Sequence, residues 1–185
     1  STIASSSGPC SFLIPLFCAV EADSIECVRL FLEAGADPRQ RDHGGRTALW
    51  QARSEPVIRL LLGQGLGLED RDRYGWTPLT ACVSDGVEAL PRLRALIECG
   101  ANPNATHDRG FTVFMSAASS TERDPAVLQA LIEAGADPKA VSELGYNAFH
   151  AAIDVNGEAN LEESVRSTLA FLKQAGVDFE GRNNR

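Results

Sequence analysis

A short apolar segment that ends at a glycine recurs five times along the chain, and this repetition constrains the fold more than any other feature of the sequence. Three of the segments read VRLFLEAGAD, LRALIECGAN and VLQALIEAGAD, and the shared glycine falls at 35, 65, 100, 135 and 176, with spacings of 30, 35, 35 and 41 residues. Self-similarity at a period of about 20 to 50 residues is the signature of solenoids and other repeat arrays. We therefore predict an array of small units that contact mainly their neighbours.

A second landmark keeps the same register. A glycine, any residue and then usually a threonine recur with spacings of 30, 35 and 35 residues, at Gly45-Arg46-Thr47, Gly75-Trp76-Thr77, Gly110-Phe111-Thr112 and Gly145-Tyr146-Asn147. In the third unit, Thr77 followed by Pro78 suits a helix start, because threonine caps free amides and proline gives up an N–H that has no partner there. Leu93, Leu96 and Ile97 repeat at helical spacing. Gly100, which follows them, suits a left-handed helix end.

The segment DRYGWTPL, from Asp72 to Leu79, resembles the ankyrin repeat signature D-x-x-G-x-T-P-L-H-x-A. The resemblance covers essentially the whole chain and implies an all-α fold, an ankyrin-repeat solenoid of stacked helix-turn-helix pairs joined by β-turn fingers. It places one domain over residues 1–185, with repeats at about 9–41, 42–71, 72–107, 108–141 and 142–185. The chain ends one residue before the next turn glycine would be due, so we expect either a piece of a longer array or an atypical end.

The units depart from the family pattern in length and in one tetrad. From Thr47 to Gly65 there are 18 residues and from Asn147 to Gly176 there are 29, where the family has about 21. We expect both differences to lie in the loop between the two helices, with about eight extra residues around 156–163. Only His150 fills the last position of the Thr-Pro-Leu-His tetrad, so packing is expected to replace the family's Thr-to-His hydrogen bond in most repeats.

Composition excludes several classes of function. The 17 Lys and Arg against 25 Asp and Glu give a net charge of −8 and a pI near 4.9. Nucleic acid is not an expected partner, because proteins bind nucleic acids mainly through clustered Lys and Arg side chains. The most apolar stretch, residues 10–20, has eleven residues, far fewer than the roughly 20 of a membrane-spanning helix. We expect no membrane insertion.

The sequence also lacks the patterns of a metal, cofactor or catalytic site. Its three histidines stand far apart, and no close pair of cysteines or histidines suggests zinc, so no metal or cofactor is expected. The sequence shows no pattern typical of a Cys-His catalytic pair or of a phosphate-binding loop, so no catalytic residue is expected. Five cysteines suit no disulfide framework, which favours a reducing, cytoplasmic location, with secretion as an effector left open. Cys10 is the expected free thiol, and burial is expected for Cys18, Cys27, Cys82 and Cys99.

The family resemblance implies that the finger tips and the first helices line a concave binding groove. The presumed tips carry a total charge of +2 in a chain of net charge −8, and they are rich in arginine and aromatic residues, which are typical of interface hot spots. A competing interpretation is that Trp76, Phe111 and Tyr146 only stack on neighbouring turns. The predicted partner-binding residues are Arg41, His43, Arg46, Arg71, Arg73, Tyr74, Trp76, Arg109, Phe111 and Tyr146.

These observations predict a non-enzymatic protein-protein interaction module that binds one protein partner through its fingers and inner helices. Two alternatives stay open. The first is a dedicated inhibitor or immunity-type protein that occludes an enzyme or toxin. The second is the recognition domain of a larger effector or enzyme. Fold analogy alone does not choose among them.

Overall fold

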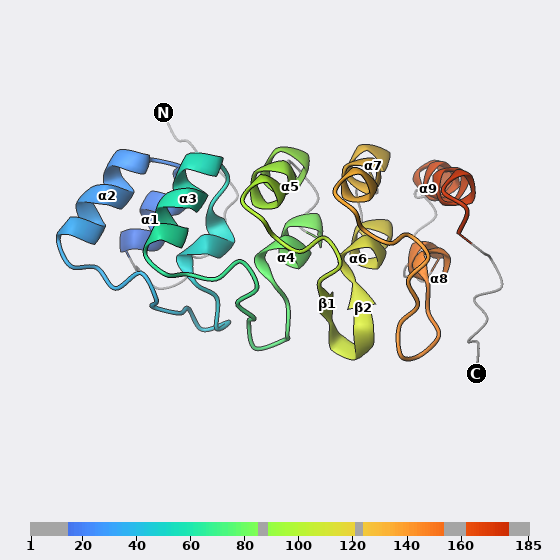
Figure 1. The fold of residues 1–185 in the computed structure, drawn as a ribbon, viewed down its shortest axis with the longest axis horizontal. Helices are drawn as coiled ribbons and strands as arrows, with labels where there is room; N and C mark the ends of the chain where they lie inside the picture. The colour runs from blue at the N-terminus through green and yellow to red at the C-terminus, as the bar shows by residue number, and fades with distance from the viewer. Residues whose placement is uncertain (1–14, 85–88, 121–123, 154–161, 178–185) are drawn as a thin grey trace, which may run out of the picture.

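The computed structural model describes residues 15–84, 89–120, 124–153 and 162–177. It contains five successive pairs of helical elements, as the repeats predict (Figure 1). The pairs are α1 (Pro15–Glu21) with α2 (Ile25–Glu33), the 3₁₀ helix η1 (Ala48–Gln51) with α3 (Glu55–Gly63), α4 (Pro78–Ser84) with α5 (Ala89–Glu98), α6 (Val113–Ser119) with α7 (Pro125–Glu133), and α8 (Ala148–Ile153) with α9 (Glu162–Gln174).

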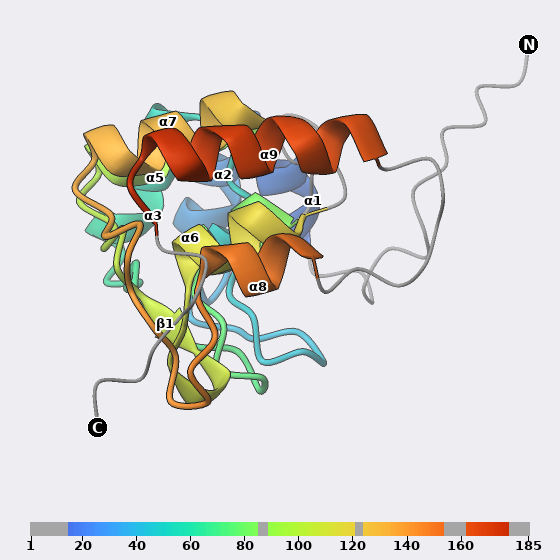
Figure 2. The ribbon, with the colours of Figure 1, turned by 90° about the vertical axis from the view of Figure 1, so that its right-hand side faces the viewer.

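The helices form two layers, with the connecting turns on one side of them. In Figure 1 the second helices of the pairs lie in one row and the first helices in another, and Figure 2 shows the turns projecting away from the helices. One turn contains the antiparallel strands β1 (Thr106–His107) and β2 (Phe111–Thr112), in which His107 pairs with Phe111. The predicted all-α solenoid is therefore confirmed, while the exact repeat boundaries stay a prediction.

Local sequence explains where the helices begin and end. Thr77 Oγ1 accepts a hydrogen bond from the Thr80 amide at 3.3 Å, and Asp124 Oδ1 accepts one from the Ala126 amide at 2.8 Å. Such side chains satisfy amides that have no partner in the first helical turn. Gly100 has a φ of +100°, a left-handed conformation that costs glycine little and ends α5. The predicted cap and helix end are both confirmed.

The core is a continuous row of apolar side chains between the two layers. Leu93 and Leu96, predicted to form the apolar face of α5, are fully buried. The same position in the inner elements, which are the first helices of the pairs, is filled in repeats two to five by Leu49, Leu79, Phe114 and Phe149, and each is buried. Because α4 packs on α6 and α6 on α8, each unit covers an apolar face of the next.

The length difference of the second repeat does not lie where the sequence suggested. The link between η1 and α3 has three residues, as does the link between α1 and α2, but η1 itself has four residues where α1 has seven. The expectation of a shortened loop was therefore wrong. A 3₁₀ helix rises about 2.0 Å per residue and an α-helix about 1.5 Å, so four residues recover most of the length of seven.

The extra length of the fifth repeat is only partly described. We placed it in a loop at 156–163, and residues 162 and 163 belong instead to α9, which has 13 residues where α7 has nine. The remaining residues of that segment lie outside the described part of the chain.

The expected burial of the cysteines is correct for only part of the set. Cys82 is buried and Cys99 is half-buried, but Cys18 and Cys27 are exposed. Helix α1 buries Leu16, Phe17, Ala19 and Val20 and turns Cys18 outward, while α2 buries only Val28. Cys10 lies outside the described residues. Across the ranges that the structure describes, no helix combines the length and apolar character needed to span a bilayer.

Candidate protein-binding surface

The turns between repeats form a row of four fingers, which we number by repeat. Finger two is residues 41–46, finger three 71–76, finger four 106–111 and finger five 141–146. In finger two, the Asp42 amide donates to Arg46 O at 2.9 Å, and Asp42 Oδ1 accepts from the Gly44 and Arg46 amides at 2.7 and 2.9 Å. Gly45 has a φ of +81°, which favours glycine. Fingers three and five repeat this turn, with Asp72 and Ser142 in the place of Asp42.

Finger four is built differently because His107 stands where fingers two and three have an aspartate. An imidazole at this position does not accept the two amides that an aspartate accepts, and the finger instead forms the β1–β2 pair, with Arg109 at a φ of +54°. His107 Nε2 lies 2.9 Å from Ser116 Oγ, on α6. The ring is 5.0 Å from that of Trp76 and 5.3 Å from that of Phe111. The His107 ring of finger four therefore contacts Trp76 of finger three and connects the two fingers with α6.

The contacts around His107 favour one tautomer of its neutral ring. When Ser116 Oγ donates its single hydrogen to Thr112 O at 3.2 Å, its oxygen is left to accept a hydrogen bond from Nε2 of the neutral imidazole. The Nδ1 atom is buried and forms no hydrogen bond within the described part of the chain. Burial lowers the pKa of His107, Arg71 lowers it further, and Asp108 and Asp72 oppose the shift. The ring is therefore neutral at pH 7.

The first hollow lies along fingers two, three and four and has a volume of about 580 Å³. Tyr74 is 66% exposed at its edge, while Trp76 is half-buried against His107. Arg46 lies with its guanidinium 5.0 Å from the ring of Trp50 and its Nε 3.3 Å from Asp72 Oδ2. The lining residues are Arg46, Arg73, Tyr74, Trp76, His107 and Asp108.

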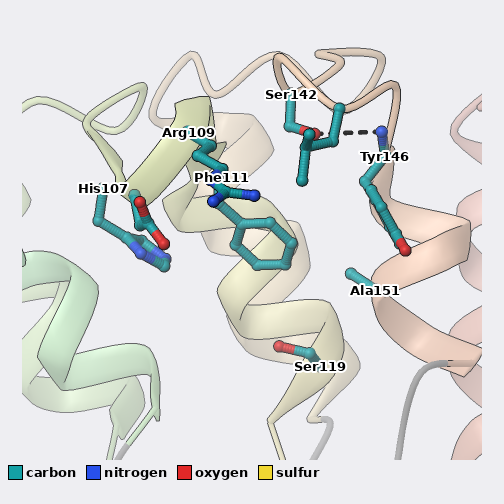
Figure 3. A pocket seen from close by; sticks show the side chains of 9 residues that line it. His107, Arg109, Phe111, Ser119, Ser142, Tyr146 and Ala151 are labelled. Atoms are coloured by element: carbon teal, nitrogen blue, oxygen red, sulfur yellow. Dashed lines mark hydrogen bonds between the residues drawn. The ribbon is translucent and has the colours of Figure 1, made fainter.

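The second hollow lies between fingers four and five and has a volume of about 390 Å³ (Figure 3). Phe111 and Tyr146 extend from the two fingers into the space between them, and Ala151 of α8 lies deeper. Leu144 is 57% exposed. Apolar surface and a few polar groups are typical of recognition sites. The lining residues are His107, Asp108, Arg109, Phe111, Ser119, Ser142, Leu144, Tyr146 and Ala151.

The structure brings seven of the ten predicted residues together in these two hollows. Arg41, Arg71 and the exposed His43 line neither one. Arg41 Nη1 donates to Gly45 O and Arg71 O, and Arg71 Nη1 donates to Gly75 O and Thr106 O, all between 2.6 and 3.1 Å. These two arginines thus link adjacent fingers. The binding roles of all ten residues stay predictions.

Sequence reasoning missed the wall that the two hollows share. His107 and Asp108 line both, and Leu144 lines the second. The signal was present three residues before each finger glycine, where Asp42, Asp72, His107 and Ser142 stand in register. A histidine there marks a finger that cannot form the same turn. Within the described residues, no three His, Cys, Asp or Glu side chains are gathered in a way that would hold a metal ion.

Comparison with known proteins agrees with this architecture. A family profile described as "Ankyrin repeats (3 copies)" matches residues 16–106 and 51–142. These matches cover more than half of the chain, and the chain therefore belongs to the ankyrin repeat family.

The curated relatives share part of this chain and are mostly much longer. Ankyrin repeat protein nuc-2 of Neurospora crassa is 37% identical over 57% of this chain and 10% of its own length. E3 ubiquitin-protein ligase KEG of Arabidopsis thaliana is 31% identical over 55% of this chain and 6% of its own. Protein phosphatase 1 regulatory subunit 27 of Homo sapiens is 42% identical over 29% of this chain and 33% of its own. The chain thus matches a third or less of each of these relatives.

Proposed function

We propose that this chain is a non-enzymatic module that binds a protein partner along fingers two to five. Ankyrin repeats are generally protein-protein interaction modules, and the family assignment supports that general role. The observation that carries the finer proposal is the pair of adjacent hollows, which share His107 and Asp108 as a wall. Together they offer a continuous surface of exposed aromatic, aliphatic and arginine side chains.

The charge of this surface indicates the chemistry of the partner. Arg46, Arg73 and Arg109 line the hollows, and among the described residues that line them Asp108 is the only carboxylate. The chain as a whole carries −8. We therefore infer that the partner presents an apolar side chain to the second hollow, beside Phe111, with acidic residues near the arginines.

A second candidate is the recognition domain of a larger protein. It is supported by the small share of the relatives that this chain matches, 10% of nuc-2 and 6% of the ligase KEG. In this case the partner would be a substrate or a regulator of the whole protein. The phosphatase regulatory subunit among the relatives keeps the inhibitor alternative in view. An intracellular, reducing location remains part of the proposal.

A capture experiment with matched baits tests the binding surface. Tyr74→Ala alters the first hollow, and Leu30→Ala alters an equally exposed side chain on α2, since the two residues are 66% and 63% exposed. A true partner is retained by the wild-type and Leu30→Ala chains and lost or weakened with Tyr74→Ala. Proteins lost only with Leu30→Ala would show that the outer helices, and not the fingers, form the binding surface.

A further inference from the structure

A separate cavity of about 250 Å³ lies on the inner side of the first three repeats. Its walls come from α1, finger two, η1 and the helices α4 and α5, through Phe17, Asp42, Trp50, Ala81 and Arg92 among others. The inner element of the second repeat has four residues, where α1 and α4 on either side have seven. The cavity therefore lies beside the shortest inner element of the stack.

Two side chains in this wall are deeply buried and lack the hydrogen bonds that their counterparts make. Thr47 is 2% exposed and Trp50 is 4% exposed. Neither Thr47 Oγ1 nor Trp50 Nε1 forms a hydrogen bond within the described part of the chain. A buried polar group without a partner is destabilising, and native structures contain few of them.

The same tetrad positions are satisfied elsewhere in the molecule. In the third repeat, Thr77 Oγ1 and Thr80 Oγ1 lie 3.0 Å apart. In the fifth, Asn147 Oδ1 lies 2.8 Å from His150 Nδ1. The second repeat has tryptophan in the last position, and its indole N–H is a donor only. Thr47 and Trp50 hold these two positions in the second repeat, and neither polar atom has a partner among the described residues.

The charges around the cavity define what could satisfy these groups. Arg46, Arg53 and Arg92 line it together with Glu21 and Asp42, so the lining residues that the structure describes carry an excess of one positive charge. Arg92 also donates to the main-chain carbonyl of Trp50. Hydrogen-bond donors therefore outnumber acceptors, although Gln51 Oε1 is a buried acceptor without a partner in the described residues. A group with one negative charge and two acceptor oxygens suits this lining.

We propose that this inner cavity binds a carboxylate group, which accepts hydrogen bonds from Trp50 Nε1 and Thr47 Oγ1 and is held by the surrounding arginines. Its volume lies below the roughly 300 Å³ of the smallest typical ligand pockets, which fits a small carboxylic acid or one Asp or Glu side chain of a protein. The inference does not rest on the proposed function, because Arg46 is the only described residue that the cavity shares with the two finger hollows.

The two tryptophans of the chain, Trp50 and Trp76, provide a direct spectroscopic readout. We expect glutarate, with one of its two carboxylates in the cavity, to shift the Trp50 indole N–H resonance in a saturable way and to leave the Trp76 resonance in place. The two resonances are assigned with Trp76→Phe. Sulfate at matched ionic strength tests for general anion binding. An unmoved Trp50 resonance, or an equal response to sulfate, would overturn the assignment of a carboxylate site.

Two threonine variants separate binding from folding. Thr47→Val removes the unpaired hydroxyl, so we expect weaker glutarate binding by about tenfold with an unchanged or higher unfolding midpoint. Thr77→Val removes a hydroxyl that is already paired, so we expect a lower midpoint and unchanged glutarate affinity. If Thr47→Val lowers the midpoint as Thr77→Val does, with no change in affinity, the proposed role of Thr47 is wrong.

An arginine pair and a peptide probe complete the test. Arg53→Gln should weaken glutarate binding about fivefold or more, whereas Arg94→Gln, on α5 and not in the cavity wall, should not. A blocked peptide of alternating Glu and Ser residues is compared with glutarate. Tighter binding of the peptide assigns the carboxylate to a protein side chain, and tighter binding of glutarate assigns it to a free acid. Equal losses with Arg53→Gln and Arg94→Gln would point to nonspecific charge attraction and overturn the site.

Discussion

The contact between fingers two and three contains side-chain bonds in addition to its main-chain hydrogen bond, and the Arg41 bridge among them has no counterpart between fingers four and five in the described part of the chain. Both contacts contain one main-chain hydrogen bond of 3.0 Å, from the Arg73 amide to Gly44 O and from the Glu143 amide to Arg109 O. At the first contact, the Arg41 guanidinium also bridges Gly45 O and Arg71 O, and Arg46 Nε lies 3.3 Å from Asp72 Oδ2. At the second, Thr106 stands in the register position of Arg41 and Arg71, and its side chain is too short to make such a bridge.

The arginines of the fingers have two structural positions: some link neighbouring fingers, and others line the hollows. Where Arg41 and Arg71 bridge successive fingers, their guanidinium groups are used within the chain. Between fingers four and five this bridge is missing, and the second hollow lies there with Leu144 and Tyr146 at its edge. We therefore expect the first fingers to contribute rigidity and the last two to contribute more of the binding energy.

The largest expected effect concerns binding at the second hollow. Replacing Leu144 and Tyr146 together by alanine should reduce the affinity for the partner by at least about 2 kcal/mol, or about 30-fold, because both side chains are partly exposed at the hollow. Isothermal titration with the captured partner measures the change. Val141→Ala is the control, since Val141 is 43% exposed on the same finger and does not line the hollow. Equal losses of affinity with both variants would show that the second hollow contributes no more binding energy than the rest of the finger.

The next effect concerns stability at the bridged fingers. Arg71→Ala removes the bonds to Gly75 O and Thr106 O, which measure 2.7 and 2.6 Å, and should lower the free energy of unfolding by about 1 to 2 kcal/mol. Urea denaturation measures it. Arg73→Ala should change stability by less than about 0.5 kcal/mol, because Arg73 contributes its main-chain amide to the contact. If both variants are equally stable, the bridge is not what distinguishes the first fingers.

A smaller effect should follow the pH. Burial lowers the pKa of His107 below its ordinary value of 6.5, so the folded chain favours the neutral ring and the unfolded chain takes up the proton first. The stabilisation from His107 is therefore present above about pH 6.5 and is lost as the pH falls from there towards the lowered pKa. Urea midpoints between about pH 7.5 and 5.5 measure it. His107→Gln, which can still donate to Ser116, should show a shallower decline, and a decline as steep as that of the wild type would assign it to other groups.

The smallest effect comes from supplying the missing bridge. Thr106→Arg places a guanidinium in register with Arg41 and Arg71, and should raise the free energy of unfolding by about 0.5 kcal/mol, the low end for a single new hydrogen bond. The same urea titration measures it, with Thr106→Met as a control for side-chain length. A gain that is equal in both variants would come from apolar contact and not from the bridge.

The repeat architecture could be predicted from the sequence because glycine marks backbone conformations directly. Gly35, Gly65 and Gly100 end helices with φ between +83° and +100°, and Gly45 and Gly75 turn the fingers at about +80°. These conformations are unfavourable for other residues, so the glycine register translates into structure without knowledge of the packing. The helix faces followed from apolar spacing for the same local reason.

The site was harder to predict because it depends on contacts between repeats. Arg41 and Arg71 are indistinguishable from Arg73 as exposed turn residues in the sequence, yet they bond to the next finger. We predicted a shorter loop in the second repeat and the structure has the short helix η1 instead, because counting residues cannot distinguish a shorter loop from a shorter, tighter helix. His107 carries no motif, and its importance depends on the rings of Trp76 and Phe111 on either side.

The shared wall at His107 has a thermodynamic consequence. The ring borders both hollows, so a ligand that displaces it in one hollow also reshapes the other. Two ligands bound in this way would be energetically coupled, and each would change the equilibrium affinity of the other by the same factor. A peptide long enough to fill both hollows would then bind with an affinity that its two halves, measured separately, do not predict by simple addition.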